Sequence, residues 1–225
     1  MTNRLFLVLI LIFTFTFSAN AQDYFEGVVE YSISYESLNE NIPKEAFETE
    51  MGKSMTAYVK EDRYAMTYYG TGQLGWMKVI VRLDEGYSYT EFEKNDTIIK
   101  EKLSTAKETL IEFKRNKKAK KTVLGEECES VTIHYKSDDP DGFLTESKGT
   151  YYFSSKYKLN SELYKDYTNG FWNLYAEESG AISIRNETEL IPLLKAITVA
   201  NSIESKELSN DIFEPNDKKP IIIED

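Results

Sequence analysis

The sequence of 225 residues contains a single cysteine, Cys128, and a single histidine, His134. One cysteine cannot form an intrachain disulfide, and the two residues together cannot build a Cys/His zinc cluster or a histidine-rich metal site. We therefore expect no cofactor and no metal held by these residue types. A site made of carboxylates alone stays open.

Positive charge is also in deficit. The 27 Lys and Arg residues face 38 Asp and Glu residues, which gives a formal net charge of -11. A phosphate backbone is bound by clustered cations in net excess on the binding face, so nucleic acid is not expected as a partner. Hydrophobic residues make up 41% of the chain and charged residues 29%, which is typical of a folded globular domain.

Long apolar runs are absent except near the amino terminus. Arg4 precedes an apolar run over residues 5–17, which leads to Ala19-Asn20-Ala21. A charge, an apolar core and a small-x-small site form the layout of a signal peptide, so we predict cleavage before Gln22 and a product that is soluble in the periplasm or outside the cell. The alternative, an uncleaved anchor, needs about 20 apolar residues. No later segment could span the membrane, and Cys128 lies too far from the cleavage site to carry an acyl anchor.

No Pro/Gly/Ser-rich linker and no internal repeat divides the remainder. We predict one domain over residues 22–216, followed by a loose tail over residues 217–225.

Alternation with a period of two residues dominates the first half of that domain. From Phe25 to Tyr35 the odd positions are mostly apolar and the even positions polar, which predicts a strand with one buried face. A short helix is expected within residues 41–51, because Pro43 suits a first turn and Gly52 a stop. Closely spaced turn signals then predict an antiparallel meander with strands at residues 55–59, 64–68, 76–83, 87–92 and from Ile98 onward.

The second half predicts further strands over residues 128–135 and 150–153 and a last hairpin over residues 181–189 and 194–208. A short helix is expected between Ser161 and Asn169, ended by Gly170. Residues 105–113 fit a capped helix and a strand equally well.

Candidates for catalysis are weak. Cys128 and His134 would be the nucleophile and its base, but six strand residues place their Cα atoms roughly 20 Å apart, beyond the reach of such a pair. No G-x-S-x-G motif is present, and nothing singles out a carboxylate pair among the acidic residues. We therefore expect no enzyme. Asn95-Asp96-Thr97 and Asn186-Glu187-Thr188 match glycosylation sequons, a pattern short enough to occur by chance.

A basic run interrupts the acidic sequence. It consists of Lys114, Arg115, Lys117, Lys118, Lys120 and Lys121. Such a run is usually a solvated loop. Alternatively, it could dock the protein on an anionic membrane surface or on an acidic partner.

Aromatic residues are the most informative bulk feature, with 16 Tyr and 12 Phe. Tyrosine combines an apolar body with a polar tip, so tyrosine-rich sheet faces could line a cavity for a hydrophobic molecule; ordinary core packing is the alternative for any single residue. The candidates for a ligand cavity are Val29, Tyr31, Ile33, Met55, Val59, Tyr64, Met66, Tyr68, Tyr87 and Tyr89.

The order of motifs resembles a family. A first strand of the form Phe25-x-Gly27-x-Val29-x-Tyr31 is followed by a short helix and hairpins, and Ile203-x-x-Lys206-x-Leu208 closes the domain. This order resembles a secreted bacterial family, a domain of unknown function grouped with the LolA/LolB-like lipoprotein carriers. The resemblance implies a mainly β (α+β) fold: a curved antiparallel half-barrel of about ten to eleven strands, with short helices across its concave side.

The resemblance also implies an apolar cavity under the helices, which holds acyl chains in the carriers. From it we expect an exported, non-enzymatic protein that binds a lipid or another hydrophobic ligand. The alternative is a structural or interaction module of the cell envelope, with a filled core and an envelope protein as partner. A carboxylate-dependent hydrolase is the third hypothesis.

Overall fold

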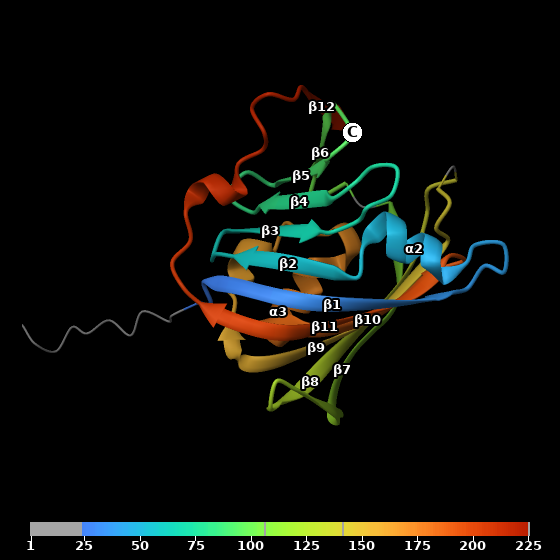
Figure 1. Cartoon of the computed structure of the whole chain (residues 1–225). Helices are drawn as coiled ribbons and strands as arrows, with labels where there is room; N and C mark the ends of the chain where they lie inside the picture. Colours follow the sequence, from blue (N-terminus) through green and yellow to red (C-terminus); the bar gives the residue numbers. More distant parts are fainter. Residues whose placement is uncertain (1–23, 106, 141, 225) are drawn as a thin grey trace, which may run out of the picture.

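A computed structural model describes residues 24–105, 107–140 and 142–224, without the side chains of residues 119 and 120. Twelve strands of these residues form one sheet in the order β12-β6-β5-β4-β3-β2-β1-β11-β10-β9-β8-β7. The strands are β1 (Gly27–Ser37), β2 (Ser54–Val59), β3 (Arg63–Tyr68), β4 (Met77–Arg82), β5 (Tyr87–Phe92), β6 (Ile98–Lys102), β7 (Glu108–Val123), β8 (Glu126–Ser137), β9 (Glu146–Lys158), β10 (Ala181–Ile191), β11 (Leu194–Ser205) and β12 (Ile221–Glu224). The sheet is strongly curved, as Figure 1 shows, and the predicted mainly β half-barrel is confirmed.

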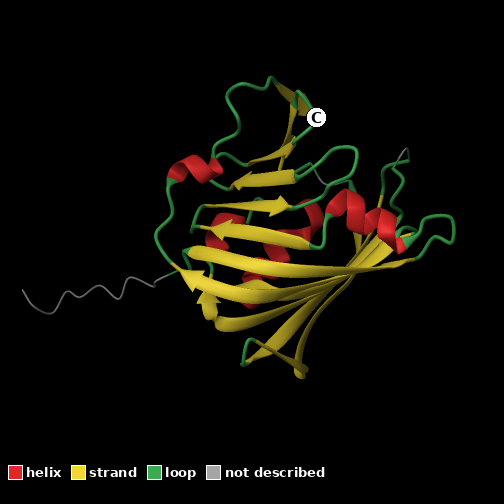
Figure 2. Ribbon diagram, in the orientation of Figure 1, coloured by secondary structure: helices red, strands yellow, loops and turns green. Residues whose placement is uncertain are grey.

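Short helices complete the described chain. They are α2 (Lys44–Met51), α3 (Trp172–Ser179) and three 3-10 turns, η1 (Ser161–Tyr164), η2 (Asn169–Phe171) and η3 (Asn210–Phe213). The segment from η1 to α3 lies behind the sheet, on its concave side (Figure 2). The helix predicted within residues 41–51 is confirmed as α2.

Strand β1 lies in the middle of the sheet, between β2 and β11. The chain runs outward from β1 to β6, crosses to β7 at the opposite edge, and returns through β8, β9 and β10 to β11. Six residue steps separate Lys102 from Glu108, and an extended chain spans at most about 3.6 Å per residue. The two halves of the sheet therefore curl toward each other at this crossing.

Alternation along β1 assigns the two faces of the sheet. Val29, Tyr31, Ile33 and Tyr35 are buried, while the even positions from Glu30 to Glu36 are exposed. The buried set belongs to the main core, which fills the concave side together with the helical segment. The period-two prediction for this strand is confirmed.

A smaller core covers part of the opposite face. Val28, Ala65, Ile80 and Tyr89 pack there against Phe213 of η3. The registers β2–β3, β3–β4 and β4–β5 put Ala65, Ile80 and Tyr89 in one cross-strand row, so these side chains share a face. The capped turn after the last long strand thus closes a second hydrophobic cluster.

Three local predictions were wrong. The tail is not loose, because Ile221–Glu224 pairs in parallel with β6 as β12 and brings the sheet to twelve strands. Ile221, Ile222 and Ile223 are β-branched residues, which favour strands. They pair with the backbone groups that β6 would otherwise leave unpaired at the edge of the sheet. The helix expected between Ser161 and Asn169 is only the turn η1, and the true helix, α3, begins at Trp172.

The basic run is the third correction. It lies within β7 rather than in a loop, and β7 also includes the ambiguous stretch from Glu108 to Phe113. Its register against β8 shifts between Asn116 and Lys121, so the intervening residues form a bulge. Two cations of this segment, Arg115 and Lys121, pair with acidic side chains of neighbouring elements.

Candidate functional site: an apolar cavity

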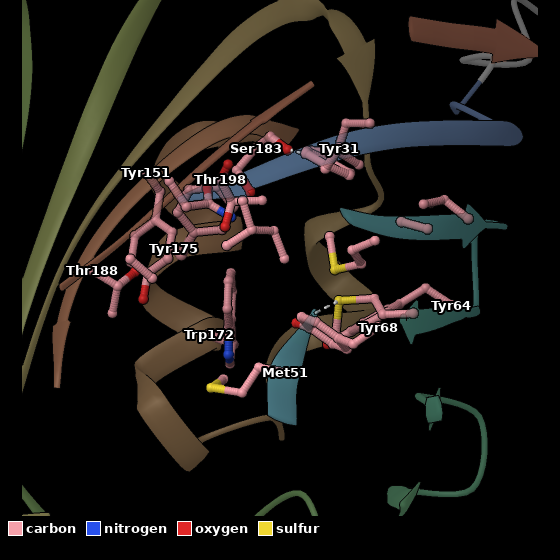
Figure 3. Close-up of a pocket in the computed structure, with 18 of the residues that line it drawn as sticks. Tyr31, Met51, Tyr64, Tyr68, Tyr151, Trp172, Tyr175, Ser183, Thr188 and Thr198 are labelled. Atoms are coloured by element: carbon pink, nitrogen blue, oxygen red, sulfur yellow. Dashed lines mark hydrogen bonds between the residues drawn. The ribbon is translucent and has the colours of Figure 1, made fainter. Parts of the chain in front are cut away.

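A cavity of about 300 Å³ lies between the concave face and the helical segment. Strands β1, β2 and β3 form one wall and β9, β10 and β11 another, while η1 and α3 cover it (Figure 3). The curvature of the sheet creates this space, because the side chains of the two halves do not meet across it.

Most of the predicted cavity residues line this space. They are Tyr31, Ile33, Met55, Val59, Tyr64, Met66 and Tyr68. The registers of β1 with β2 and of β2 with β3 place Tyr31, Met55 and Tyr68 in one cross-strand row. Three adjacent strands thus present tyrosine and methionine to the same cavity.

The other three predicted residues lie elsewhere. Val29 is fully buried in the main core but does not line the cavity. Tyr89 belongs to the core on the opposite face, and Tyr87 packs against that same core. Alternation along β5 separates its two faces but does not tell which of them lines the cavity. The pairing of Tyr89 with Ile80 places Tyr89 on the face that packs in the second core.

An aromatic cluster that the sequence did not reveal forms the cover. Trp172 of α3 lies 5.1 Å from Tyr151 of β9 and 5.4 Å from Tyr175, between ring centroids. The Tyr151 ring occupies the space above Gly149, where an added Cβ would lie 2.4 Å from ring atoms. A glycine inside a strand signals such a close approach, and this was the one available hint.

Helix α3 is fixed to the sheet by a cation from the basic run. Arg115 donates to the backbone oxygen of Glu178 at 2.6 Å and to its carboxylate at 3.0 Å, and it pairs with Glu129 at 2.8 Å. Its guanidinium also lies 5.4 Å from the ring centroid of Phe153. A cation at the carboxyl end of a helix is favoured by the helix dipole, so Arg115 has a structural role.

The rest of the basic run is divided. Lys121 forms an ion pair with Glu187, whereas Lys114, Lys117 and Lys118 are exposed. The side chain of Lys120 lies outside those that the structure describes. Docking on an anionic surface therefore stays a prediction that concerns the exposed lysines only.

Hydrogen bonds tie the middle of the helical cover, at η2, to the crossing between β6 and β7. The backbone N–H groups of Thr168 and Asn169 donate to the Leu103 oxygen at 2.9 and 3.1 Å. The N–H of Gly170 donates to the Glu108 carboxylate at 2.7 Å, and burial raises the pKa of that carboxyl group. The cover is thus held at η2 and at the carboxyl end of α3.

The hydroxyl groups of three lining tyrosines are occupied by the backbone. Tyr31 donates to the Ser183 oxygen at 2.8 Å, Tyr35 to the Gly52 oxygen at 2.9 Å and Tyr175 to the Ala181 oxygen at 3.0 Å. Burial raises the pKa of all three phenols and raises that of Tyr68 to about 12. The rings, rather than the hydroxyl groups, are therefore what these tyrosines offer to a ligand.

No charged side chain is among the residues that line the cavity; its polar members are the tyrosines, Trp172, Ser183, Asn186, Thr188 and Thr198. Acid–base chemistry is favoured by a group whose pKa lies near the working pH beside the substrate, whereas burial raises the pKa of Tyr31, Tyr35, Tyr68 and Tyr175 of this lining. The arrangement suits binding of an apolar molecule.

The remaining chemical candidates do not form a site. Cys128 is buried, donates weakly to the Glu126 oxygen at 3.5 Å and has its thiol pKa raised by burial. His134 bonds instead to the Glu146 carboxylate at 2.8 Å. Where the chain is described, no group of three or more His, Cys, Asp or Glu side chains is arranged to hold a metal ion. Within residues 24–105, 107–140 and 142–224, no helix has the length and apolar character that a membrane crossing requires.

Solved structures resemble the chain over most of its length. An uncharacterized conserved protein from Thermus thermophilus is 5% identical, with a TM-score of 0.45, over 88% of this chain and 91% of that one. A LolA superfamily protein from Nitrosomonas europaea is 7% identical, with a TM-score of 0.38, over 85% of this chain and 91% of that one. No protein-family model matches, and no curated protein does.

The second of these solved structures is a LolA superfamily protein, the grouping that the motif order of this chain resembles. Similarity at this level carries no information about a ligand or an activity. The site therefore has to be interpreted from its own residues.

The buried phenols predict a loss of stability in alkali. Tyr68 has a pKa of about 12 in the folded protein, against about 10 in an unfolded chain. Above pH 10 the unfolded state binds fewer protons than the folded state, so the free energy of unfolding should fall by about 1.4 kcal/mol per pH unit for each such tyrosine until pH approaches 12. Urea unfolding at pH 8, 10 and 11 measures this fall.

The variant Tyr68→Phe should show a shallower decline. Tyr69→Phe is the matched control, because its ring is the neighbour in sequence and is 46% exposed. Equal slopes for the two variants between pH 10 and 11 would contradict the burial of Tyr68.

Proposed function

We propose that this protein binds a lipid or another hydrophobic small molecule in the cavity and performs no chemistry on it. The observation that carries this proposal is the uncharged cavity of about 300 Å³ lined by tyrosine, methionine and tryptophan. Cavities of this kind, mostly apolar with a few polar groups, are the usual form of small-molecule sites.

The size of the cavity bounds the ligand. At the roughly 30 Å³ that a water molecule takes in the liquid, a volume of about 300 Å³ has room for about ten heavy atoms. Each buried methylene contributes about 0.8 kcal/mol, so eight of them would contribute about 6 kcal/mol before the entropic cost of association. A medium-length chain therefore suffices for useful affinity.

The two other hypotheses find less support. A structural module with a filled core would not leave a cavity of this volume. Here the aromatic side chains that line the cavity leave about 300 Å³ between them. A carboxylate-dependent hydrolase needs acidic side chains at its site, and the residues that line the cavity include none. An envelope protein as partner is compatible with the binding proposal, because a carrier has to pass on its ligand.

Binding should weaken when the cavity is filled from its wall. Ala196 of β11 lines the cavity, opposite Tyr35 on one side and Thr188 on the other. The change Ala196→Phe should lower the affinity for heptyl methyl ether, an apolar probe of nine heavy atoms, at least tenfold, because two displaced methylenes already correspond to about 1.6 kcal/mol. Isothermal titration calorimetry measures the affinity.

Ile197→Phe is the matched control. Ile197 is the next residue of the same strand, is 38% exposed and does not line this cavity. The control should bind the probe as the unchanged protein does. Equal affinities for the two variants, or no binding by the unchanged protein, would refute the proposal.

We also propose that the protein acts outside the cytoplasm, in the periplasm or the extracellular space. Support comes from the amino-terminal sequence alone, since residues 1–21 lie outside the described residues. The intact mass of protein recovered from the envelope or medium of a bacterial host should correspond to a chain that begins at Gln22. A chain that keeps residues 1–21 and stays with the cytoplasmic or membrane fraction would contradict export.

A further inference from the structure

The polarity of the cavity is one-sided. Asn186 and Thr188 of β10 and Thr198 of β11 lie on one wall, while Met55 and Met66 lie on the other. Figure 3 shows Thr188 and Thr198 beside Tyr151, away from Tyr64 and Tyr68. A ligand in this space meets the polar atoms of Asn186, Thr188 and Thr198 at one end and mainly tyrosine rings and methionine thioethers at the other.

Asn186 lies in the centre of the polar wall. The strand registers put it directly between Thr198 of β11 and Tyr151 of β9 in one cross-strand row. The alternation of β10 turns Arg185 and Glu187 to the opposite face, where they pair with each other at 2.6 Å. Asn186 is therefore held on the cavity side by the pattern of its own strand, and the sequon that begins at Asn186 points into the protein.

The side-chain oxygen Oδ1 of Asn186 is buried and has no hydrogen-bond partner. A buried acceptor without a donor costs free energy that its pairing would recover. Two other oxygens of the described residues share this condition, those of Asn169 and Asn173, but neither residue lines the cavity. Asn186 is thus the cavity-lining residue that carries an unpaired buried acceptor.

The surrounding protein does not supply the missing donor. The hydroxyl groups of Tyr31 and Tyr175, which line the same space, donate to backbone oxygens. The terminal torsion of an asparagine side chain is soft, so the amide can turn its oxygen toward a donor that enters the cavity. A ligand can supply this donor.

The charge of that donor is also constrained. Because no lining residue is charged, an ionised carboxylate or ammonium group would be buried without a counter-charge, which is far more costly than burial of a neutral polar group. A neutral group that donates one hydrogen bond fits the wall.

We propose that the ligand is a neutral amphiphile whose hydroxyl or amide group donates a hydrogen bond to Asn186 Oδ1 while its apolar part lies against Met55 and Met66. This inference rests on the proposed function and adds the class of ligand. It makes Asn186 a specificity-determining residue: the apolar wall binds the chain, and the polar wall selects the end group.

The test compares two isomers, n-octanol and heptyl methyl ether, which share heavy atoms and size but differ in the hydroxyl donor. By isothermal titration calorimetry at pH 8, the unchanged protein should bind n-octanol about tenfold tighter than the ether, and octanoate, ionised at this pH, more weakly than either. In Asn186→Leu the preference for the alcohol should disappear while ether binding persists. Asn173→Leu, the same change at an asparagine whose buried oxygen is also unpaired but which does not line the cavity, should keep the preference.

The outcomes separate the two proposals. Equal affinity for the alcohol and the ether, or tighter binding of octanoate, overturns the role of Asn186 and leaves the apolar binding site in place. No binding of either isomer overturns the proposed function, and the present inference with it. The comparison of isomers in the unchanged protein decides the matter even if Asn186→Leu does not fold.

Discussion

The pairing of β1 on both of its edges is the constraint on which the remaining architecture depends. β1 joins the outward-running strands β2 to β6 and the returning strands β8 to β11, so its strict alternation assigns the faces of both halves. One face becomes the concave core and the other is open or covered by η3. A slip of one residue at this position would exchange the two faces of the whole sheet.

The curvature of the sheet and the pairing of buried hydroxyl groups together produce an apolar cavity. A curved sheet leaves space between its halves, and the helical segment closes that space without filling it. Arg115 holds this segment at the carboxyl end of α3, and Glu108 and Leu103 hold it at η2. The hydroxyl groups of Tyr31, Tyr35 and Tyr175 are satisfied by backbone oxygens. What remains is a ring-lined cavity with one unpaired amide oxygen, that of Asn186.

The sequence predicted the strands and helices that are determined by the order of neighbouring residues. Strand β1, helix α2 and the hairpin of β2 and β3 follow from alternation and stop signals, and seven cavity residues follow from them. Features that depend on the pairing register of the strands were missed. Tyr87 and Tyr89 face the second core rather than the cavity. Tyr151 and Asn186 line the cavity because β9, β10 and β11 pair with one another. Helix α3 was missed because it has no side-chain cap that would mark its start in the sequence. Tertiary contacts of Trp172, Tyr175 and Arg115 stabilise it instead.

The central claim is that the cavity holds an apolar molecule, and mass spectrometry of organic-solvent extracts tests it most directly. The purified protein and its Ala196→Phe variant, prepared side by side, would be extracted and compared. The account predicts a small neutral amphiphile near one molecule per chain in the first extract and its depletion in the second. Extracts of the same composition, with nothing enriched in the unchanged protein, would contradict it.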